Sequence, residues 1–427
     1  MGNIALRTIL VALVFAGLAQ SGSWREDLST AKRLREEGKS EAADTAFRGV
    51  IASAKQMDQH APATGLELNS MGKQLYLAAR YAEAEAVYRM ALDAFDAPGP
   101  DTSVNRALTD GNLGVLLRAQ GRYQEAESRL SESLKQLEAL QGPDSRDYAI
   151  MASNLGSVYW AQGDLAKAEA LVHRADAIFA QGPASDSRRG NRQILGSIYV
   201  AQQRYQDAEE LLLSLLEGAG DQQAASIYNN LTAVALGRAE YVLAEERARS
   251  AVELSRRALP AGHPVLAACL NNLAQALRFQ GRYLEAERLY RDALEVWEQA
   301  YGPRHPDVAK GLINLGAFYH ERGREAGAED LYLRGAAILE ETYGARDARA
   351  LAARNELAEV LRAERRYTES EKLARATLPL LEQALPAQDP TLVRALANWA
   401  RLLGETKRPA EAAEVLNRIR LGKSSFR

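Results

Sequence analysis

Apolar residues recur along the chain at the three- and four-residue spacing of an amphipathic helix, and such segments alternate with short polar breaks. In one segment, Leu270, Leu273 and Leu277 fall on one helical face. Gly281 follows and predicts the end of this helix, because glycine adopts the left-handed conformation of a helix C-cap without strain. A second helix is predicted to begin near Leu284. The pattern therefore predicts a helix pair, and it returns along most of the chain.

One phrase marks the start of each second helix. It reads Gly-Arg-Tyr-Leu-Glu-Ala-Glu at 281–287 and Gly-Arg-Tyr-Gln-Glu-Ala-Glu at 121–127, with weaker copies elsewhere. The positions aligned with Tyr283 are 40, 81, 123, 165, 205, 241, 283, 325, 367 and 409. The last four intervals are all 42 residues, whereas the interval from 205 to 241 is 36. Self-similarity at a fixed period indicates stacked repeats, here about ten helix pairs.

The first helix of each unit carries its own phrases. Pro264 and Pro306 each follow a histidine, and proline is favoured in the first turn of a helix, where its missing N–H costs nothing. An Asn-Leu phrase comes later, for example at 271–274. Glutamates such as Glu125 and Glu127 recur at the start of almost every second helix, where they complement the helix dipole. We therefore interpret these paired carboxylates as part of the scaffold rather than as acid–base catalysts.

These phrases carry a family resemblance. Leu273, Ala274, Ala286, Tyr290 and Ala293 match the signature positions of the tetratricopeptide repeat, whose usual length is about 34 residues. With its 42-residue period and its His-Pro and Asn-Asn-Leu-Ala phrases, the chain resembles the kinesin light chain type of this repeat. The resemblance implies an all-α fold, a right-handed α-solenoid of about ten antiparallel helix pairs whose concave groove binds a protein or peptide. It does not imply a kinesin partner.

The resemblance also implies a binding face. In similar repeats the Asn of the Asn-Leu phrase faces the groove, where its amide holds the backbone of a bound peptide by donating and accepting at once. The candidate peptide-binding asparagines are Asn112, Asn154, Asn230, Asn272, Asn314 and Asn398, flanked by Asn229 and Asn271. Arg278 and Lys310 are candidates to meet an acidic peptide. The alternatives are that the amides bond neighbouring helices and that the cations form a solvated charged face.

The shortened interval predicts a joint in the array. A leucine-rich helix at 211–216 is followed by Gly218-Ala219-Gly220. We therefore expect an N-terminal sub-array at 24–220 and a C-terminal sub-array at 221–427. The polar stretch at 182–190 is expected to form a loop.

The first 23 residues differ from the repeats. Arg7 precedes an apolar run at 9–19, and small residues such as Gly17 and Ala19 end that run. This order is typical of a secretory signal peptide. The run is too short to span a membrane, which takes about 20 apolar residues. We expect an exported protein, periplasmic or secreted; the alternative is an uncleaved N-terminal helix that tethers the protein to the membrane.

Composition and the candidate reactive residues narrow the classes of function that fit this chain. The net charge of −3 gives no basic face for nucleic acid and no polybasic stretch for lipid. The single cysteine, Cys269, cannot form an internal disulfide. His263 and His305 occupy equivalent positions, where a shared metal ion is an alternative to a loop residue before proline. We expect no metal and no other cofactor.

Catalytic signatures are absent from the sequence. It contains no phosphate-binding glycine loop, no nucleophile elbow and no zinc-binding helix pair. The repeats leave no room for a separate catalytic domain. We therefore expect a non-enzymatic scaffold that binds an unknown protein or extended peptide, and no stable membrane insertion once the signal peptide is cleaved. Self-assembly is the second hypothesis, and the oligomeric state is left open.

Overall fold

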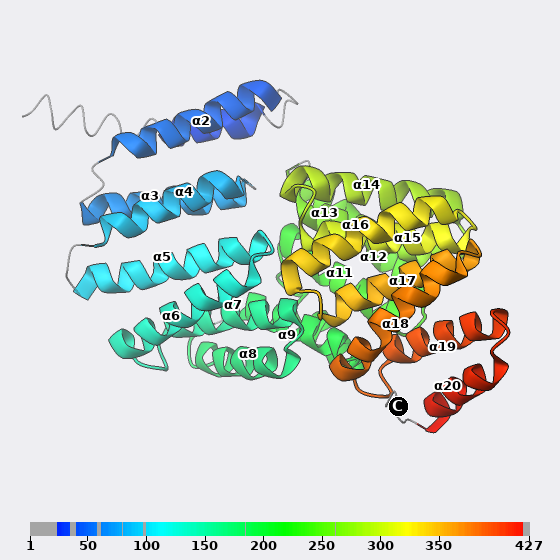
Figure 1. The fold of residues 1–427 in the computed structure, drawn as a ribbon. Coiled ribbons are helices and arrows are strands. Elements are labelled where there is room, and N and C mark those ends of the chain that lie inside the picture. The colour runs from blue at the N-terminus through cyan, green and yellow to red at the C-terminus, as the bar shows by residue number, and fades with distance from the viewer. Residues whose placement is uncertain are drawn as a thin grey trace, which may run out of the picture. The chain divides into compact units, whose positions relative to one another are not determined.

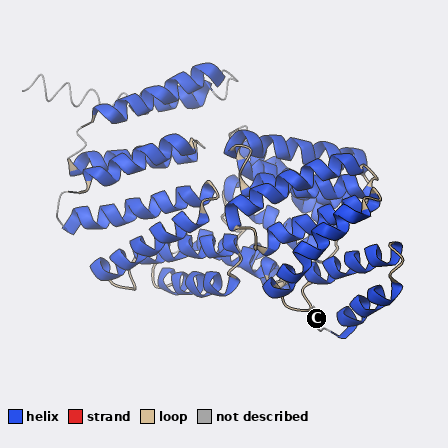
Figure 2. Cartoon of the chain, in the orientation of Figure 1, coloured by secondary structure: helices blue, strands red, loops and turns tan. Residues whose placement is uncertain are grey.

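The computed structural model describes residues 24–34, 40–57, 61–78, 80–96, 100–183, 185–260 and 262–421. In these residues every regular element is an α-helix (Figure 2). The chain divides into two compact units, Met1–Ile198 and Tyr199–Arg427. The predicted division after residue 220 lies between the helices α10 and α11 and stays a prediction. The predicted signal peptide at 1–23 lies outside the described residues.

The first unit begins with a helix at residues 24–34. It continues with α2 Ser40–Gln56, α3 Pro62–Leu77, α4 Tyr81–Ala94, α5 Pro100–Ala119, α6 Tyr123–Gln141, α7 Arg146–Gln162, α8 Leu165–Phe179 and α9 Asp186–Ala201 (Figure 1). The last of these helices runs three residues past the boundary between the units.

The second unit holds the rest of the array. Its helices are α10 Tyr205–Ser214, α11 Asp221–Gly237, α12 Tyr241–Ala258, α13 Pro264–Phe279, α14 Tyr283–Tyr301, α15 Pro306–Glu321, α16 Glu325–Tyr343, α17 Ala348–Ala363, α18 Tyr367–Ala384, α19 Pro390–Glu405 and α20 Pro409–Leu421. The even-numbered helices from α2 to α20 all begin at the aligned positions found in the sequence. The predicted α-solenoid of helix pairs is therefore confirmed, and α10 is the predicted short helix.

Small residues let the two helices of a pair approach each other. Ala274 on α13 faces Ala286 and Ala293 on α14, and all three are fully buried in one hydrophobic cluster. Tyr290 is 1% exposed and fills the space beside them. Each pair also packs against the next pair within its unit. Burial of apolar surface between neighbours thus stabilises the stack along its length.

In every pair whose turn the structure describes, a residue in the left-handed conformation lies two positions before the second helix. Gly281 has a φ of 80°, as predicted for a C-cap glycine. Among these described turns, four have a larger residue there: Gln203, Ala239, Arg365 and Lys407 have φ values between 59° and 65°. A side chain in this conformation costs about 1–2 kcal/mol. The repeat geometry therefore fixes this backbone turn even where glycine is missing.

The expected loop at 182–190 is wrong in its second half, because α9 begins at Asp186. The Ser185 hydroxyl accepts a hydrogen bond from the backbone N–H of Arg188 at 3.3 Å and so caps this helix. Asp186 in the first turn complements the helix dipole. Polar residues that cap a helix and those of a loop look alike in the sequence.

In six of the described turns, an arginine just before the second helix ties neighbouring pairs together. In the 281–287 phrase, Arg282 binds Glu285 of its own helix at 2.8 Å and Glu245 of the preceding second helix at 2.6 Å. Burial raises the pKa of Glu245, but hydrogen bonds from Arg249 and Arg282 outweigh burial and lower it. The cross-pair partners are Arg80 with Asp44, Arg122 with Glu85, Arg282 with Glu245, Arg324 with Glu287, Arg366 with Glu329 and Arg408 with Glu371.

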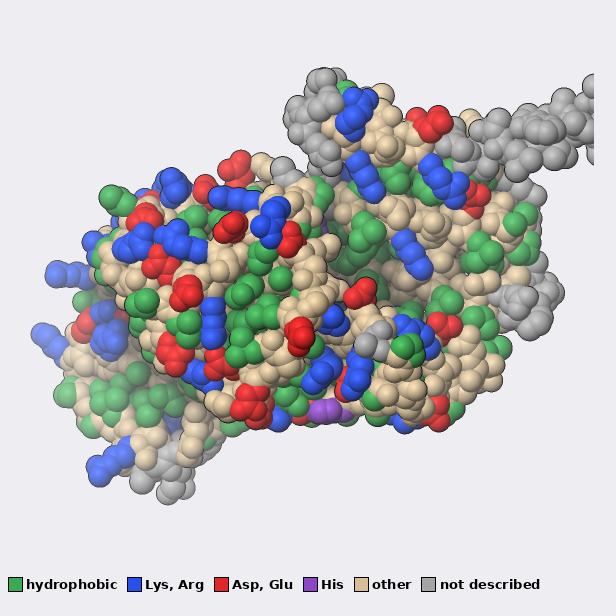
Figure 3. Space-filling view, turned by 180° about the vertical axis from the view of Figure 1, so that it is seen from behind, with side chains coloured by type: hydrophobic (Ala, Val, Ile, Leu, Met, Phe, Trp, Pro, Cys, Tyr) green, Lys and Arg blue, Asp and Glu red, His purple; other side chains and the backbone are tan. Residues whose placement is uncertain are grey.

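This arginine ladder accounts for the repeated Arg-Tyr-x-Glu-Ala-Glu phrase, since each of its charged positions has a partner in the stack. It also mixes the two signs of charge over the surface. On the face that Figure 3 displays, basic and acidic side chains lie next to one another. The recurring glutamates thus take part in the ion pairs of the stack, and the sequence alone does not reveal these arginine partners.

Candidate functional site

The first helices of neighbouring pairs lie side by side in each unit. Contacts join α3 to α5 and α5 to α7 in the first unit, and α11 to α13, α15 to α17 and α17 to α19 in the second. Asn272 and Gln275 are three residues apart on α13, so they share one face of this helix. We call the side of the second unit formed by α11, α13, α15, α17 and α19 the first-helix face.

The predicted asparagines in the second unit bond to one another across these helices. Asn314 donates to the Oδ1 atom of Asn271 at 2.9 Å, and Asn272 donates to Oδ1 of Asn229 at 2.9 Å. Asn271 also donates to Oδ1 of Asn272 at 3.4 Å. The four amides form a continuous ladder from α15 through α13 to α11. Asn230, the neighbour of Asn229, is half-buried on α11.

We call each hydrogen bond between asparagine side chains of neighbouring first helices a rung. The described part of the first unit contains one. Asn112 on α5 donates to Oδ1 of Asn69 on α3 at 2.9 Å. Asn154 on α7 has no such rung, because Gly111 occupies the partner position on α5. A Cβ atom at Gly111 would lie 2.1 Å from the sulfur of Met151, so no side chain fits there. The described part of the chain offers the Asn154 amide no hydrogen-bond partner.

These rungs give the asparagines a role in stacking. A hydrogen bond between neutral groups contributes a net of about 1 kcal/mol, and a buried amide left without its partner costs about 1–3 kcal/mol. Asn271 is fully buried and Asn272 is 8% exposed, so removal of the hydrogen-bond partner of either amide would lower the stability of the stack. An amide has two N–H donors and a carbonyl with two acceptor sites. A rung uses one donor of one amide and one acceptor of the other, which leaves capacity for a ligand at Asn314, the half-exposed end of the ladder.

The asparagine column is interrupted on α17, where Glu356 takes the aligned position. Burial raises the pKa of Glu356, and the nearby charges of Arg394 and His320 oppose that rise. Arg394 on α19 binds this carboxylate at 2.9 Å, and its own side chain is 60% exposed. The column therefore changes from neutral amides at α11–α15 to a carboxylate at α17, which Arg394 of α19 binds.

The two candidate cations differ. Arg278 is only 13% exposed and its guanidinium binds the carboxylate of Glu321 on α15. Lys310 on α15 is exposed, and within the described ranges no acidic side chain pairs with it. Lys310 lies one helical turn before Asn314 and so shares its face. Of the two, Lys310 is the cation whose charge is available to a partner.

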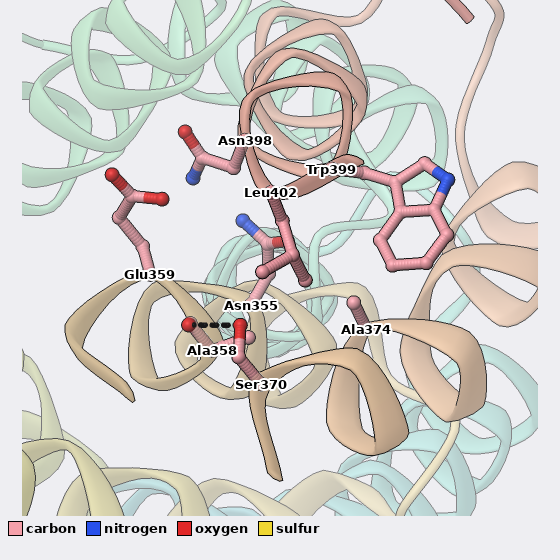
Figure 4. A pocket seen from close by; sticks show the side chains of 8 residues that line it. All are labelled: Asn355, Ala358, Glu359, Ser370, Ala374, Asn398, Trp399 and Leu402. Carbon is pink, nitrogen blue, oxygen red and sulfur yellow. Dashed lines mark hydrogen bonds between the residues drawn. The ribbon is translucent and has the colours of Figure 1, made fainter. Parts of the chain in front are cut away.

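A pocket missed by sequence reasoning lies between α17, α18 and α19. Its lining includes Asn355, Glu359, Asn398 and Trp399 (Figure 4). Asn355 and Asn398 stand in the same register as Asn271 and Asn314, 84 residues further along the chain. That register could have revealed the pair, but no sequence pattern shows whether the two amides bond to each other.

Metal-binding groups are absent from the described residues, where no cluster of three or more His, Cys, Asp or Glu side chains forms. His263 and His305 instead cap their helices: each Nδ1 accepts a backbone N–H, from Val265 at 3.2 Å and from Asp307 at 3.1 Å. Cys269 is fully buried, and burial raises its pKa to about 11. Among the helices described, none is both long and apolar enough to cross a membrane.

Sequence comparisons identify the family of the repeats. Family models described as tetratricopeptide repeat match residues 105–180, 193–226, 265–341 and 350–391, which together make up more than half of the chain. A comparison with curated proteins finds no match.

Solved structures share the fold. The quorum sensor NprR in complex with its cognate peptide NprX is 14% identical, with a TM-score of 0.56 over 84% of this chain and 98% of that one. The apo form of NprR from B. thuringiensis has a TM-score of 0.53, with the same identity and coverage. Kinesin light chain TPR-like repeats attributed to Podosopora anserina are 22% identical over 46% of this chain and 92% of that one, with a TM-score of 0.40.

Proposed function

Since the chain belongs to the tetratricopeptide repeat family, we propose that it is a non-enzymatic scaffold whose first-helix face binds an extended peptide or a segment of a partner protein. The observation that carries this proposal is the neutral amide ladder that ends at half-exposed Asn314, one turn from the unpaired Lys310. An amide matches the N–H and C=O groups of a peptide backbone, and a lysine matches a carboxylate. The NprR–NprX complex shows that a protein of similar fold holds a peptide.

The charges on the face suggest how the partner is oriented. Asn230 and Asn272 lie on helices whose face positions are uncharged, such as Ser226, Ala268 and Gln275. Towards α17 and α19 the face carries ion pairs instead, including Glu356 with Arg394. A partner that places a neutral stretch over α11 and α13 and a carboxylate near Lys310 would leave no charge unpaired.

The test is a binding measurement on a selected peptide. A random peptide library displayed on phage is selected against the full chain, and the Kd of the best peptide is measured by calorimetry. Replacing Asn272 and Asn314 by alanine removes about two hydrogen bonds of roughly 1 kcal/mol each, so we expect binding to weaken by roughly thirtyfold. Lys310→Glu is expected to weaken binding of peptides that carry a carboxylate.

The control separates binding from stacking. Asn69→Ala breaks the equivalent rung in the first unit and should lower stability as the loss of one rung does. It should leave the peptide Kd unchanged. Equal losses of affinity in the Asn69 variant and in the Asn272 and Asn314 variant would show that the amides act only through stability.

We further propose that the protein is exported, on the strength of the Arg7 charge, the apolar run at 9–19 and the small residues after it. Mass spectrometry of the protein from its native cells should find an N-terminus between residues 18 and 24. An intact Met1 in a membrane fraction would contradict cleavage and favour the uncleaved tether.

A further inference from the structure

Three turns of the second unit follow one another along one edge of the stack. They are the turns α11–α12, α13–α14 and α15–α16, at residues 238–240, 280–282 and 322–324. The rings of Tyr241 and Phe279 stack at 4.7 Å and so join the first turn to the second. The guanidinium of Arg322 lies 4.2 Å from the centre of the Tyr283 ring and joins the second turn to the third. We call this row of three turns the turn edge.

Apolar side chains protrude from the turn edge. Leu284 is 88% exposed and Val242 is 75% exposed, the two highest values among the large hydrophobic side chains that the structure describes. Phe279 between them is half-exposed. Single exposed leucines are normal on a protein surface, whereas a contiguous apolar patch marks a site of interaction. The turn edge is therefore a surface that another molecule covers.

Charges of opposite sign lie at the two ends of the turn edge. Glu240 in the first turn and Arg322 in the third are both exposed, and neither forms an ion pair within the described residues. The other charged side chains of these turns are bound: Arg238 by Glu209, Arg282 by Glu245 and Arg324 by Glu287. Glu240 and Arg322 are thus the two charges of the turn edge that the stack itself does not use.

Glu240 departs from the pattern of the repeats. It stands at the position of Arg282, so the chain replaces an arginine of the ladder by a residue of opposite charge. The carboxylate that this arginine would bind, Glu209, is held by Arg238 and Arg247 instead. The stack is therefore complete without an arginine at position 240, and the carboxylate of Glu240 is available to a partner.

We propose that the turn edge binds the turn edge of a second copy of this chain in a two-fold symmetric dimer. A two-fold axis at the middle turn places the first turn of one copy against the third turn of the other. Glu240 then meets Arg322 of the second copy, and the same contact forms at the opposite end. Phe279 and Leu284 lie in or next to the middle turn and meet their own counterparts. The dimer goes beyond the peptide-binding function and does not depend on it.

A second copy is favoured over other partners because the turn edge is complementary to itself. An antiparallel copy gives both Glu240 and Arg322 a counter-charge and covers apolar side chains with apolar side chains. A partner surface of one charge would leave either Glu240 or Arg322 without a counter-charge. An anionic lipid surface would attract Arg322 but repel Glu240.

The first test is the mass of the full chain in solution. Small specific interfaces dissociate in about the micromolar range, so sedimentation velocity is run between about 1 and 200 µM. We expect a monomer that becomes a dimer over this range and nothing larger, because a two-fold contact is closed. Leu284→Asp is expected to weaken the dimer by at least about tenfold, since it removes an apolar side chain of each copy from the contact. Leu416→Asp, at an exposed leucine of α20, is the matched control and should leave the dimer unchanged.

An exchange of charges tests how the two copies are arranged. Glu240→Arg and Arg322→Glu each place like charges opposite one another, so each alone is expected to weaken the dimer by roughly tenfold. The two changes together restore opposite charges and should return the dissociation constant to within about threefold of the native value. Circular dichroism should show native helicity in every variant, because all the substituted side chains are exposed.

Four results would overturn the proposal. The first is a chain that stays monomeric at every concentration, and the second is a dimer that Leu284→Asp leaves intact, which would place the contact on another surface. The third is a double charge variant that binds no more tightly than the single variants, which would contradict the pairing of Glu240 with Arg322. The fourth is assembly that continues past the dimer, which a closed contact does not allow.

Discussion

Replacing Trp297 by alanine is expected to destabilise the Tyr199–Arg427 unit by about 3–5 kcal/mol, the usual loss when a buried aromatic side chain is truncated. Trp297 on α14 is 2% exposed and belongs to the core that joins several helix pairs. Its ring rests on Gly311 of α15, where a Cβ atom would lie 3.0 Å from the Cε3 atom of Trp297. The neighbouring helices cannot move in to fill this cavity, because each of them is packed against the other helix of its own pair.

Thermal unfolding of the variant checks this result. A loss of this size should lower the Tm of the unit by roughly 10 °C. Trp160→Ala is the matched control, because Trp160 is 38% exposed and its removal should cost less than about 1 kcal/mol. A Trp297→Ala protein that melts with the native chain would contradict the assignment of this core.

Replacing Arg362 by methionine is expected to cost about 1–3 kcal/mol, because it removes one of the two arginines that bind the buried carboxylate of Glu359; the other, Arg401, remains. Glu359 is 5% exposed in its side chain and Arg362 is 15% exposed, so water screens their interaction poorly. Arg362 also binds Glu405, which joins α17 to α19. Hydrogen bonds that Arg362 donates to Glu359 and to Glu405 raise its pKa above the ordinary value, against the effect of burial, so this guanidinium stays charged.

A double variant distinguishes an unpaired charge from lost packing. Arg362→Met combined with Glu359→Met removes both charges and should be more stable than Arg362→Met alone. Arg304→Met serves as the surface control, since Arg304 and Glu341 are 79% and 60% exposed and such pairs contribute about 0–1 kcal/mol. Urea unfolding that gives equal losses for the single and double variants would refute the ion-pair explanation.

The helix pairs could be predicted from the sequence because their signals are local. The aligned positions carry tyrosine or its substitutes, and each starts a second helix as expected. The left-handed turn at Ala239 and Arg365 could not be read in the same way, since neither residue favours it. At these residues the packing of the surrounding helix pairs determines the backbone conformation. In the sequence, only their position within the repeat indicates the turn.

The candidate site could be predicted in part. Its asparagines share one register, but the sequence does not show which amides face each other across 43 residues, as Asn272 and Asn229 do. Ion pairs likewise depend on the neighbouring helix pair, so the sequence does not show that Arg278, a candidate to meet an acidic peptide, is bound by Glu321. The pocket at Asn355 depends on the spacing of α17 and α19, which side chains such as Trp399 and Leu402 determine by packing.

Site-specific photo-crosslinking tests the proposed binding face most directly. A benzophenone amino acid is placed at Gln275, on the face of α13 that carries Asn272, or at Arg288, which is exposed on the second helix α14. Each protein is irradiated with the peptide selected by phage display. The account predicts a peptide adduct from position 275 and none from position 288. An adduct from position 288 alone, or equal adducts from both, would contradict binding at the first-helix face.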